Sequence, residues 1–432
     1  MTSPSSVPSD APLAGIRVLD LGMFWAGPYS GRILGEAGAD VIKVESQRRS
    51  DPLRMQARGL FPGGEPGERP WNRSGMVNER NRAKRSLVID LTSEEGSAIF
   101  KRLAAVSDLV IENYSTGVME RFGLGYETLH AVNPKLVMVS ITSQGLSGPE
   151  SAYVSYGTTL EQNGGLFAVT GYPERTPGFS SLAFPDPMGG MTAAGMALAA
   201  LRMARRTGCG SHVDISQREM TTHFVGEAFM EAVMTDTAPV PIGNRHPRFA
   251  PQGVYQCSGD DRWVTLTIAS DDEWAVLCDV IARGDLATDT RLATVDGRRD
   301  HHDEIDDALR AWAGPLDVDD SVGQLRAADL MAGPVLNSAD LYADEQLDAR
   351  HYFETIHDPD AGTHRYIGRP FRISGVSLES GRPTPLFGGH NEELLTELLE
   401  MTADEVAGLE ERGVIGDVPE GLRVGPRGNG GS

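Results

Sequence analysis

Hydrophobic residues in the first third of the chain recur in short runs separated by longer amphipathic stretches. The runs predict buried strands at residues 16–21, 40–45, 86–91, 108–112 and 135–141. Helices are expected from about Ala26 to Gly38, and from the predicted cap Ser93 to Val106. Strands that alternate with helices of this length are typical of βαβ units. The sequence therefore predicts an α/β fold with a doubly wound, Rossmann-like parallel sheet, whose ligands would lie at the carboxyl ends of the strands.

The pattern changes twice further along the chain. Residues 188–206 predict a central helix rich in Gly and Ala, and residues 207–216 predict a glycine turn into a strand. Residues 255–268 predict a β-hairpin, followed by helices with acidic faces. We expect a large domain interrupted by a smaller α+β domain: residues 13–225, then the small domain at 226–333, then a return at 334–424 with a closing helix at 391–399. Residues 1–12 and 425–432 are expected to be flexible tails.

The amino-acid composition argues against several classes of function. The chain has 432 residues with 39 Lys and Arg against 61 Asp and Glu, a net charge of −22, which argues against nucleic-acid binding. Its three cysteines show no metal-ligand spacing, so we expect a reducing compartment and no metal site. The start of the chain lacks the features of a signal peptide, and the most apolar stretch, Met188–Met203, is too short to cross a bilayer. We therefore expect a cytoplasmic protein without a membrane partner.

Common catalytic motifs are missing from the sequence. The first predicted strand–turn–helix offers GMFWAGP instead of GxGxxG, and GxxxxGK[ST], HExxH and GxSxG do not occur. What remains is Asp186, which lies between Pro185 and Pro187 and just before Gly189 and Gly190. Pro187 favours a non-helical backbone at Asp186, which would make Asp186 a helix N-cap. Alternatively, a rigidly held carboxylate beside two glycine amides would suit covalent acyl chemistry. The local pattern leaves both interpretations open.

Several longer motifs resemble the family III CoA-transferases, the formyl-CoA and carnitine CoA-transferase group. They are GIRVLDLGMFWAGPYSGRILGEAGADVIKVE (15–45), NRAKRSLVIDL (81–91), LVIENYSTGVMERFGLGYETL (109–129), NPKLVMVSITSQGLSGP (133–149) and TGCGSHVDISQREM (207–220). The resemblance covers nearly the whole chain. It implies an interlaced homodimer that acts on an acyl-CoA and a small carboxylic acid, with coenzyme A as a substrate and no tightly bound cofactor.

The resemblance also implies roles for individual residues. Asp186 occupies the place of the family's catalytic aspartate, so it is expected to be both N-cap and nucleophile. Arg121 matches an arginine that holds a CoA phosphate, although a surface charge would explain it too. The other CoA contacts match Trp25, Ala26, Ile89, Asp90, Leu91, Thr92, Asn113, Tyr114 and Ser115; for Ile89 and Leu91, simple burial in the strand is an equally good explanation.

Departures from the family pattern concern the substrate. Ser46 stands where the family often has arginine, with Arg48 and Arg49 nearby as substitutes. Val154 replaces a lysine of oxalate-handling members, which makes oxalate a poor candidate. The expected substrate pocket comprises Tyr156, Gly189, Gly190, Arg245 and His246, although the charged members could equally be ordinary surface residues.

The favoured hypothesis is CoA transfer between carboxylates through a covalent intermediate on Asp186, with succinyl-CoA as the suggested donor. An acyl-CoA racemase of the same fold is the first alternative; its histidine would align near Tyr156, whose phenol, with a pKa of about 10, is a poor base. An intramolecular CoA transfer (an isomerase) and a catalytically silent CoA-binding protein are the others.

Overall fold

The computed structural model describes residues 11–54, 60–175, 178, 180–376, 378 and 381–420. The chain forms two compact units: the first comprises residues 1–166, 179–226 and 350–432, and the second residues 167–178 and 227–349. Of the two expected tails, residues 1–10 and 425–432 lie outside the described residues. The return to the first unit comes at Arg350 and not at the expected residue 334, because Pro334 is still paired with Val264 in a sheet of the second unit. No helix among the described residues is both long and apolar enough to cross a membrane.

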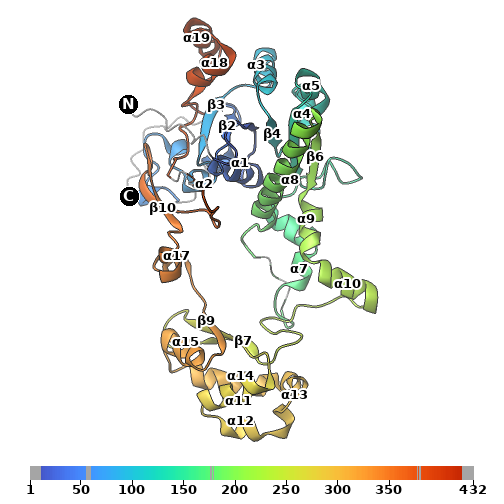
Figure 1. The fold of residues 1–432 in the computed structure, drawn as a ribbon, viewed down its shortest axis with the longest axis vertical. Helices are drawn as coiled ribbons and strands as arrows, with labels where there is room; N and C mark the ends of the chain where they lie inside the picture. Colours follow the sequence, from blue (N-terminus) through green and yellow to red (C-terminus); the bar gives the residue numbers. More distant parts are fainter. Residues whose placement is uncertain are drawn as a thin grey trace, which may run out of the picture. The chain divides into compact units, whose positions relative to one another are not determined.

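A six-stranded parallel sheet forms the centre of the first unit (Figure 1). Its strand order is β3-β2-β1-β4-β5-β6, and every neighbouring pair is parallel. The bounds are β1 Arg17–Asp20, β2 Asp40–Glu45, β3 Lys84–Val88, β4 Leu109–Glu112, β5 Val137–Thr142 and β6 His212–Ser216. This is the strand order of a doubly wound fold, so the predicted sheet is confirmed.

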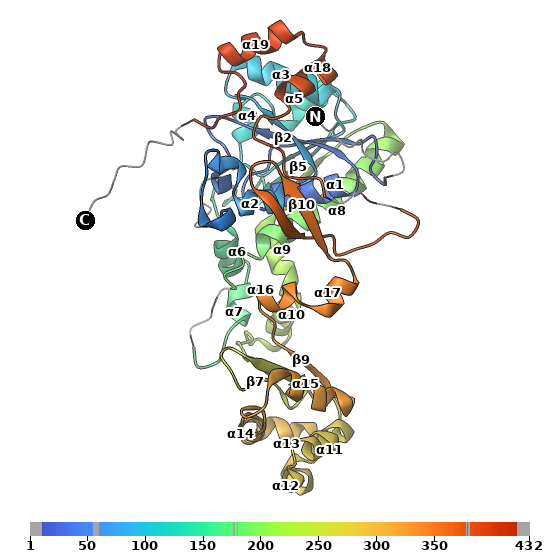
Figure 2. The same ribbon diagram turned by 90° about the vertical axis from the view of Figure 1, so that its left-hand side faces the viewer.

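Helices cover both faces of this sheet (Figure 2). Helices α1 (Ala26–Glu36) and α8 (Pro185–Thr207) pack on one face, and α3 (Glu94–Ala105) and α18 (Asn391–Leu399) on the other. Alternate residues of one strand serve the two faces: Val18 joins the core beneath α8, and Leu19 the core beneath α3. Burial on both sides explains why the strands read as continuous apolar runs.

Shorter elements complete the first unit. Ser93 caps α3 as predicted, with its hydroxyl accepting a hydrogen bond from the Gly96 amide. The segment between β2 and β3, which shows no periodicity in the sequence, contains three 3₁₀ turns at Pro52–Arg54, Pro62–Gly64 and Pro70–Asn72. The remaining elements are α2 Gly75–Arg80, α4 Val118–Arg121, α5 Tyr126–Val132, α6 Gly157–Asn163, α7 Leu166–Val169, α9 Gln217–Phe224, α10 Gly226–Thr235, α19 Ala403–Glu411 and the hairpin β10 Phe353–Asp358 with β11 Gly362–Ile367; α7 and α10 run into the second unit.

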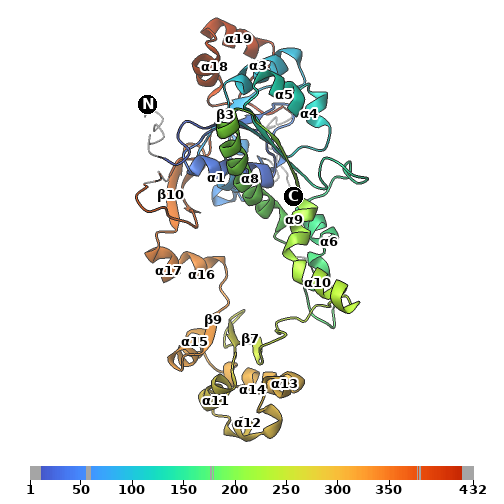
Figure 3. The ribbon, with the colours of Figure 1, turned by 45° about the vertical axis from the view of Figure 1, so that its right-hand side comes forward.

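The second unit is built of helices and strands (Figure 3). It has a hydrophobic core of its own. Strands β7 (Gln252–Gln256), β8 (Trp263–Thr267) and β9 (Met331–Pro334) form an antiparallel sheet, and β7 and β8 are the predicted hairpin. Buried Trp274 and Leu277 belong to that core. Its helices are α11 Asp271–Val280, α12 Gly284–Thr288, α13 Val295–Asp300, α14 His302–Ala313, α15 Val318–Ala327, α16 Ser338–Tyr342 and α17 Glu345–Ala349, with a 3₁₀ turn at Thr290–Leu292.

Candidate active site

A cavity of about 660 Å³ lies at the carboxyl ends of the central strands. Residues 23–26 after β1, Ser46 after β2 and residues 89–92 after β3 line it, together with residues 113–116 after β4. The first turns of two helices close it with Asp186 and Gln217. In an open α/β sheet this edge is the usual ligand site, because loops from many strands converge there.

Most of the expected CoA contacts are brought together at this cavity. Those that line it are Trp25, Ala26, Ile89, Asp90, Leu91, Thr92, Asn113, Tyr114 and Ser115. Asn113 also joins two of the loops, since its amide nitrogen donates to the Met23 carbonyl at 2.9 Å and its amide oxygen accepts from the Met23 amide at 2.7 Å. The loops after β1 and β4 are therefore held in a fixed relation.

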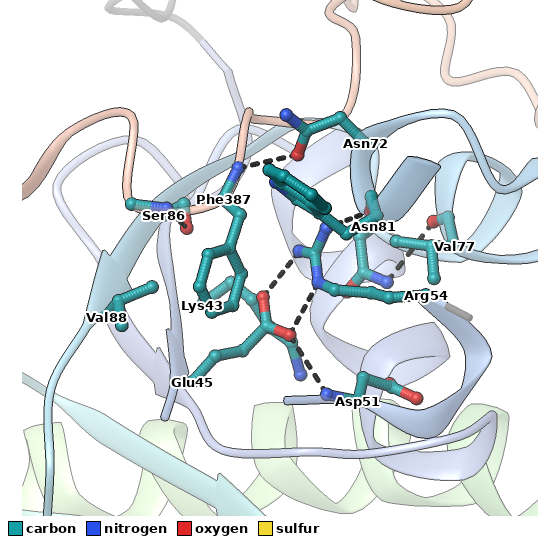
Figure 4. Close-up of polar contacts among 12 residues, drawn as sticks. Lys43, Glu45, Asp51, Arg54, Asn72, Val77, Asn81, Ser86, Val88 and Phe387 are labelled. Carbon is teal, nitrogen blue, oxygen red and sulfur yellow. Dashed lines mark hydrogen bonds and ion pairs between the residues drawn. The ribbon is translucent and has the colours of Figure 1, made fainter. Parts of the chain in front are cut away.

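A buried ion pair holds the loop after β2 (Figure 4). Arg54 Nη2 lies 2.5 Å from Glu45 Oε2, and both side chains are almost fully buried. Burial alone would raise the pKa of Glu45, but the charge and hydrogen bonds of Arg54, together with the charge of Lys43, lower it to about 2. The residues between the two partners include Ser46, Arg48 and Arg49, which all line the cavity.

Asp186 lies in the first turn of α8, and the expectation that it would be the N-cap is wrong. The helix begins at Pro185, and Phe184 occupies the N-cap position. The Asp186 amide donates to the Ala183 carbonyl at 2.9 Å. Ala183 takes a left-handed backbone with φ of 48°, and the buried carboxylate of Glu161 accepts the Phe184 amide at 3.1 Å. These contacts move the start of the helix ahead of Asp186, and Pro187 still falls in the first turn, where a missing N–H costs little.

The Asp186 carboxylate has an unusual electrostatic environment. Burial raises its pKa to about 6, and two groups limit the rise: the hydrogen bond from Gln217 and the positive charge of Arg80. Gln217 Nε2 lies 3.0 Å from Asp186 Oδ1. Among the described residues, the other oxygen, Oδ2, has no hydrogen-bond partner. A partly desolvated carboxylate with one free oxygen facing a cavity can act as a nucleophile.

Gly189 and Gly190 do not line the cavity, and their place in α8 argues against a role for their amides as oxyanion donors. From the fifth residue of an α-helix onward, each amide donates to the carbonyl four residues earlier, so both amides have intrahelical acceptors. The glycines instead allow close packing. A Cβ atom on Gly190 would lie 2.6 Å from the Ala26 carbonyl oxygen.

Of the other expected site residues, one lines the cavity and three do not. Tyr156 lines the cavity and packs edge-on against Phe24, with ring centroids 5.5 Å apart. Arg121, in α4, is exposed and is not a lining residue, and its guanidinium has no partner in the described part of the chain. Arg245 and His246 belong to the second unit, where Arg245 pairs with Asp306 at 3.3 Å and His246 stacks on Phe249 at 4.5 Å.

Three residues around Asp186 were missed by the sequence analysis: Gln217, Arg80 and Glu161. Gln217 offered a usable signal, because it is a polar residue directly after a predicted strand, at the sheet edge where ligands bind. Arg80 and Glu161 lie in the short helices α2 and α6, which the sequence did not predict, and neither gave such a signal. Among the described residues, no group of three or more His, Cys, Asp or Glu side chains could hold a metal ion.

Comparison with known proteins identifies the family. Residues 13–391 match the family model described as CoA-transferase family III. The chain is 34% identical to the succinyl-CoA–D-citramalate CoA-transferase of Chloroflexus aurantiacus, over 94% of this chain and 98% of that protein. It is 31% identical to the succinate–glutarate CoA-transferase of Agrobacterium fabrum, over 91% and 97%. The crystal structure of a CAIB/BAIF family protein from Brucella suis superposes with a TM-score of 0.82 at 31% identity, over 90% of this chain and 99% of that one. The chain therefore belongs to CoA-transferase family III.

Proposed function

We propose that this CoA-transferase moves CoA from an acyl-CoA to a free carboxylic acid through a covalent intermediate on Asp186. The observation that carries the proposal is the state of the Asp186 carboxylate. It faces the cavity with a free Oδ2, and its pKa of about 6 lies below 7, so most of it is ionised at pH 7. It is thus in the nucleophilic form at neutral pH and less solvated than a surface carboxylate.

The reaction balances without water, a nucleotide or net proton transfer. Asp186 Oδ2 bonds to the donor carbonyl carbon, and CoA leaves as the thiolate with the electron pair of the broken C–S bond. The thiolate attacks Cγ of the mixed anhydride, which gives an aspartyl-CoA thioester and releases the donor acid as a carboxylate. The acceptor carboxylate then attacks Cγ and expels the thiolate, which takes the acceptor acyl group and restores the Asp186 carboxylate.

The other acidic side chains that line the cavity are engaged in polar contacts. The Glu45 carboxylate is paired with Arg54. Asp90 Oδ1 accepts from the Thr92 amide at 3.0 Å and from the Thr92 hydroxyl at 2.5 Å, and Asp90 Oδ2 lies 3.3 Å from Arg48 Nη1. Attack by either carboxylate would break these contacts, whereas attack by Asp186 Oδ2 breaks none.

Succinyl-CoA is the donor to test first, with short dicarboxylic acids as acceptors. Support comes from two relatives, whose names specify transfer between succinyl-CoA and D-citramalate and between succinate and glutarate. The cavity borders Arg48 and Arg49, whose charges suit an anionic ligand such as the phosphates of CoA.

An interlaced, cytoplasmic homodimer remains our proposal for the assembly and its setting. Helix α10 supports a dimer, since Phe229, Val233 and Met234 are 60%, 64% and 78% exposed in the single chain. Large exposed apolar side chains on one helix usually mark a contact surface. The three unpaired cysteines suit a reducing compartment. Light scattering after gel filtration gives the mass directly, and a monomer at micromolar concentration would contradict the dimer.

The test of the proposed function is trapping of the intermediate. The protein is incubated with succinyl-CoA and other acyl-CoAs without an acceptor, treated with hydroxylamine or borohydride, and digested for peptide mass spectrometry. We expect the CoA thioester or its trapped product on the Asp186 peptide of the wild type and not of Asp186→Asn. Asp90→Asn is the matched variant, because it removes another cavity carboxylate and should keep the label on Asp186.

Two outcomes would count against the proposal. A label that persists in Asp186→Asn would place the covalent step on another residue. Absence of a label with every donor, in protein that binds CoA by calorimetry, would favour the racemase-like or silent CoA-binding alternatives.

A further inference from the structure

The side-chain amide of Gln217 lies directly against the proposed reacting group. Gln217 is the first residue of α9, immediately after β6, and its side chain is buried. Its Nε2 lies 3.0 Å from Asp186 Oδ1 and 3.4 Å from the Pro185 carbonyl oxygen. Both neighbours accept hydrogen bonds, so the NH₂ end of the amide must face Asp186.

The surroundings fix this amide in place. The Ser216 hydroxyl caps α9 by accepting from the Glu219 amide, and the Thr221 hydroxyl donates to the Gln217 carbonyl at 2.7 Å. Gly189 leaves room for the side chain, since a Cβ atom there would lie 3.3 Å from both Cγ and Nε2 of Gln217. In the described part of the chain, Gln217 is the only side chain hydrogen-bonded to the Asp186 carboxylate.

We propose that Gln217 is the oxyanion donor for every step in which the Asp186 carbonyl carbon is attacked. This inference rests on the proposed function of Asp186 and adds the group that stabilises its tetrahedral intermediates. It assigns to a side chain the role that the sequence analysis gave to the Gly189 and Gly190 amides.

The proposed role of Gln217 depends on which oxygen of Asp186 accepts its hydrogen bond, which is Oδ1. When Oδ2 bonds to the donor, Oδ1 becomes the carbonyl oxygen of the mixed anhydride and still faces Nε2. Attack of the CoA thiolate on Cγ places negative charge on Oδ1, and loss of the donor carboxylate removes it again. The acceptor carboxylate attacks the same carbon, so charge develops on Oδ1 a second time. A donor already in position needs no reorganisation, and loss of one such donor typically costs about 10²–10³-fold in kcat.

Gln217→Met tests the donor, because methionine has a similar length and no N–H. We expect kcat for CoA transfer to fall about 10²-fold, with KM for the acyl-CoA changed by less than about threefold. The rate at which succinyl-CoA alone forms the Asp186 thioester should fall by the same factor. Since the Gln217 hydrogen bond limits the rise of the Asp186 pKa, the acidic limb of kcat/KM should also move to higher pH.

Gln217→Glu separates hydrogen-bond donation from simple support of Asp186. Protonated glutamic acid can donate to Oδ1, whereas its anion cannot. The introduced carboxyl group and Asp186 would share one proton as a coupled pair beside the Arg80 charge. We therefore expect activity that falls on the alkaline side, where the wild type is level, and that partly recovers at lower pH. Gln217→Met should show no such recovery.

Glu219→Gln is the matched control, since residue 219 is exposed on the same helix and its side chain does not line the cavity. It should keep wild-type kinetics. Wild-type kcat and an unmoved pH profile in Gln217→Met would overturn the inference, and so would equal, pH-independent losses in the Met and Glu variants. If Asp186→Asn still forms the covalent adduct, the proposed function itself fails, which is a separate outcome.

Discussion

The guanidinium of Arg80 lies over the indole ring of Trp25, with its Cζ atom 4.0 Å from the ring centroid. Arg80 ends α2, and Trp25 precedes α1 and lines the cavity. The contact places a buried positive charge close enough to Asp186 to lower the pKa of that carboxyl. Arg80 is buried, and the loss of solvation lowers its pKa; its charge therefore acts through a medium of low polarity.

Replacing Arg80 by methionine should move the acidic limb of kcat/KM upward. Without the Arg80 charge, only the Gln217 hydrogen bond still lowers the pKa of Asp186. That pKa therefore rises above about 6, and a smaller fraction of Asp186 is ionised at pH 7. The measurement is kcat/KM for the acyl-CoA between pH 5 and 8. Arg80→Lys keeps the charge and should show a smaller shift. If the acidic limb of kcat/KM lies at the same pH in wild type and Arg80→Met, Arg80 acts only through packing on Trp25.

Asp186→Asn should be inactive and yet more stable than the wild type at pH 7. The folded protein holds Asp186 with a pKa raised from 3.8 to about 6, so the native state binds more protons than the unfolded state between these values. Stability therefore falls as the pH rises through this window. Asparagine removes the charge, and we expect a gain of about 1–3 kcal/mol at pH 7. Urea denaturation at pH 7 and pH 4 measures it; the gain should nearly vanish at pH 4.

The fold could be predicted because its signal is local. Strands buried on both faces, such as β2 and β5, appear in the sequence as continuous apolar runs. Ser93, followed by Glu94 and Glu95, indicates the start of a helix. The family resemblance, confirmed by the comparisons, singled out Asp186, which lies in the first turn of α8 and lines the cavity. The boundary near residue 334 was misjudged because the pairing of Pro334 with Val264 joins residues far apart in the sequence.

The environment of Asp186 could not be read from its neighbours. Proline on both sides suggested an N-cap, but the helix start is decided by Glu161, which accepts hydrogen bonds from the Ser180 and Phe184 amides. Gln217 stands 31 positions from its partner and meets it only because α9 begins at the sheet edge beside α8. Such relations depend on tertiary packing, and a single sequence carries no periodicity that reports them.

Removing Arg54 should destabilise the protein, because it leaves the Glu45 carboxylate buried without its partner. We expect Arg54→Met to lose about 3–5 kcal/mol at pH 7. The native Glu45 pKa is lowered from 4.5 to about 2, so the stability that the pair provides is complete above pH 4.5 and is lost as the pH falls toward 2. The difference between variant and wild type should therefore shrink in acid, which urea titrations at pH 3.5 and 7 would measure.

The double variant Glu45→Gln, Arg54→Met is the control for this pair. It leaves no unpaired carboxylate, so it should lose less than Arg54→Met alone. Equal losses would show that the packing of Arg54, whose Cζ atom lies 5.0 Å from the centre of the Phe387 ring, matters more than its ion pair with Glu45.

Two glycines of α8 should respond in opposite ways to the same substitution. A Cβ atom on Gly190 would lie 2.6 Å from the Ala26 carbonyl oxygen and 3.2 Å from Tyr29 Cβ, so Gly190→Ala must push α8 away from α1. We expect a loss of about 1–3 kcal/mol, and also a loss of activity, because Ala26 and Asp186 line the same cavity. Gly195, five residues further along α8, has open space at its Cβ position. Gly195→Ala should gain about 0.5–1 kcal/mol, since alanine is the better helix former. Thermal unfolding of both variants and the wild type measures these changes in stability. If Gly190→Ala and Gly195→Ala changed the stability by similar amounts, close packing of α8 on α1 would not determine the position of Asp186.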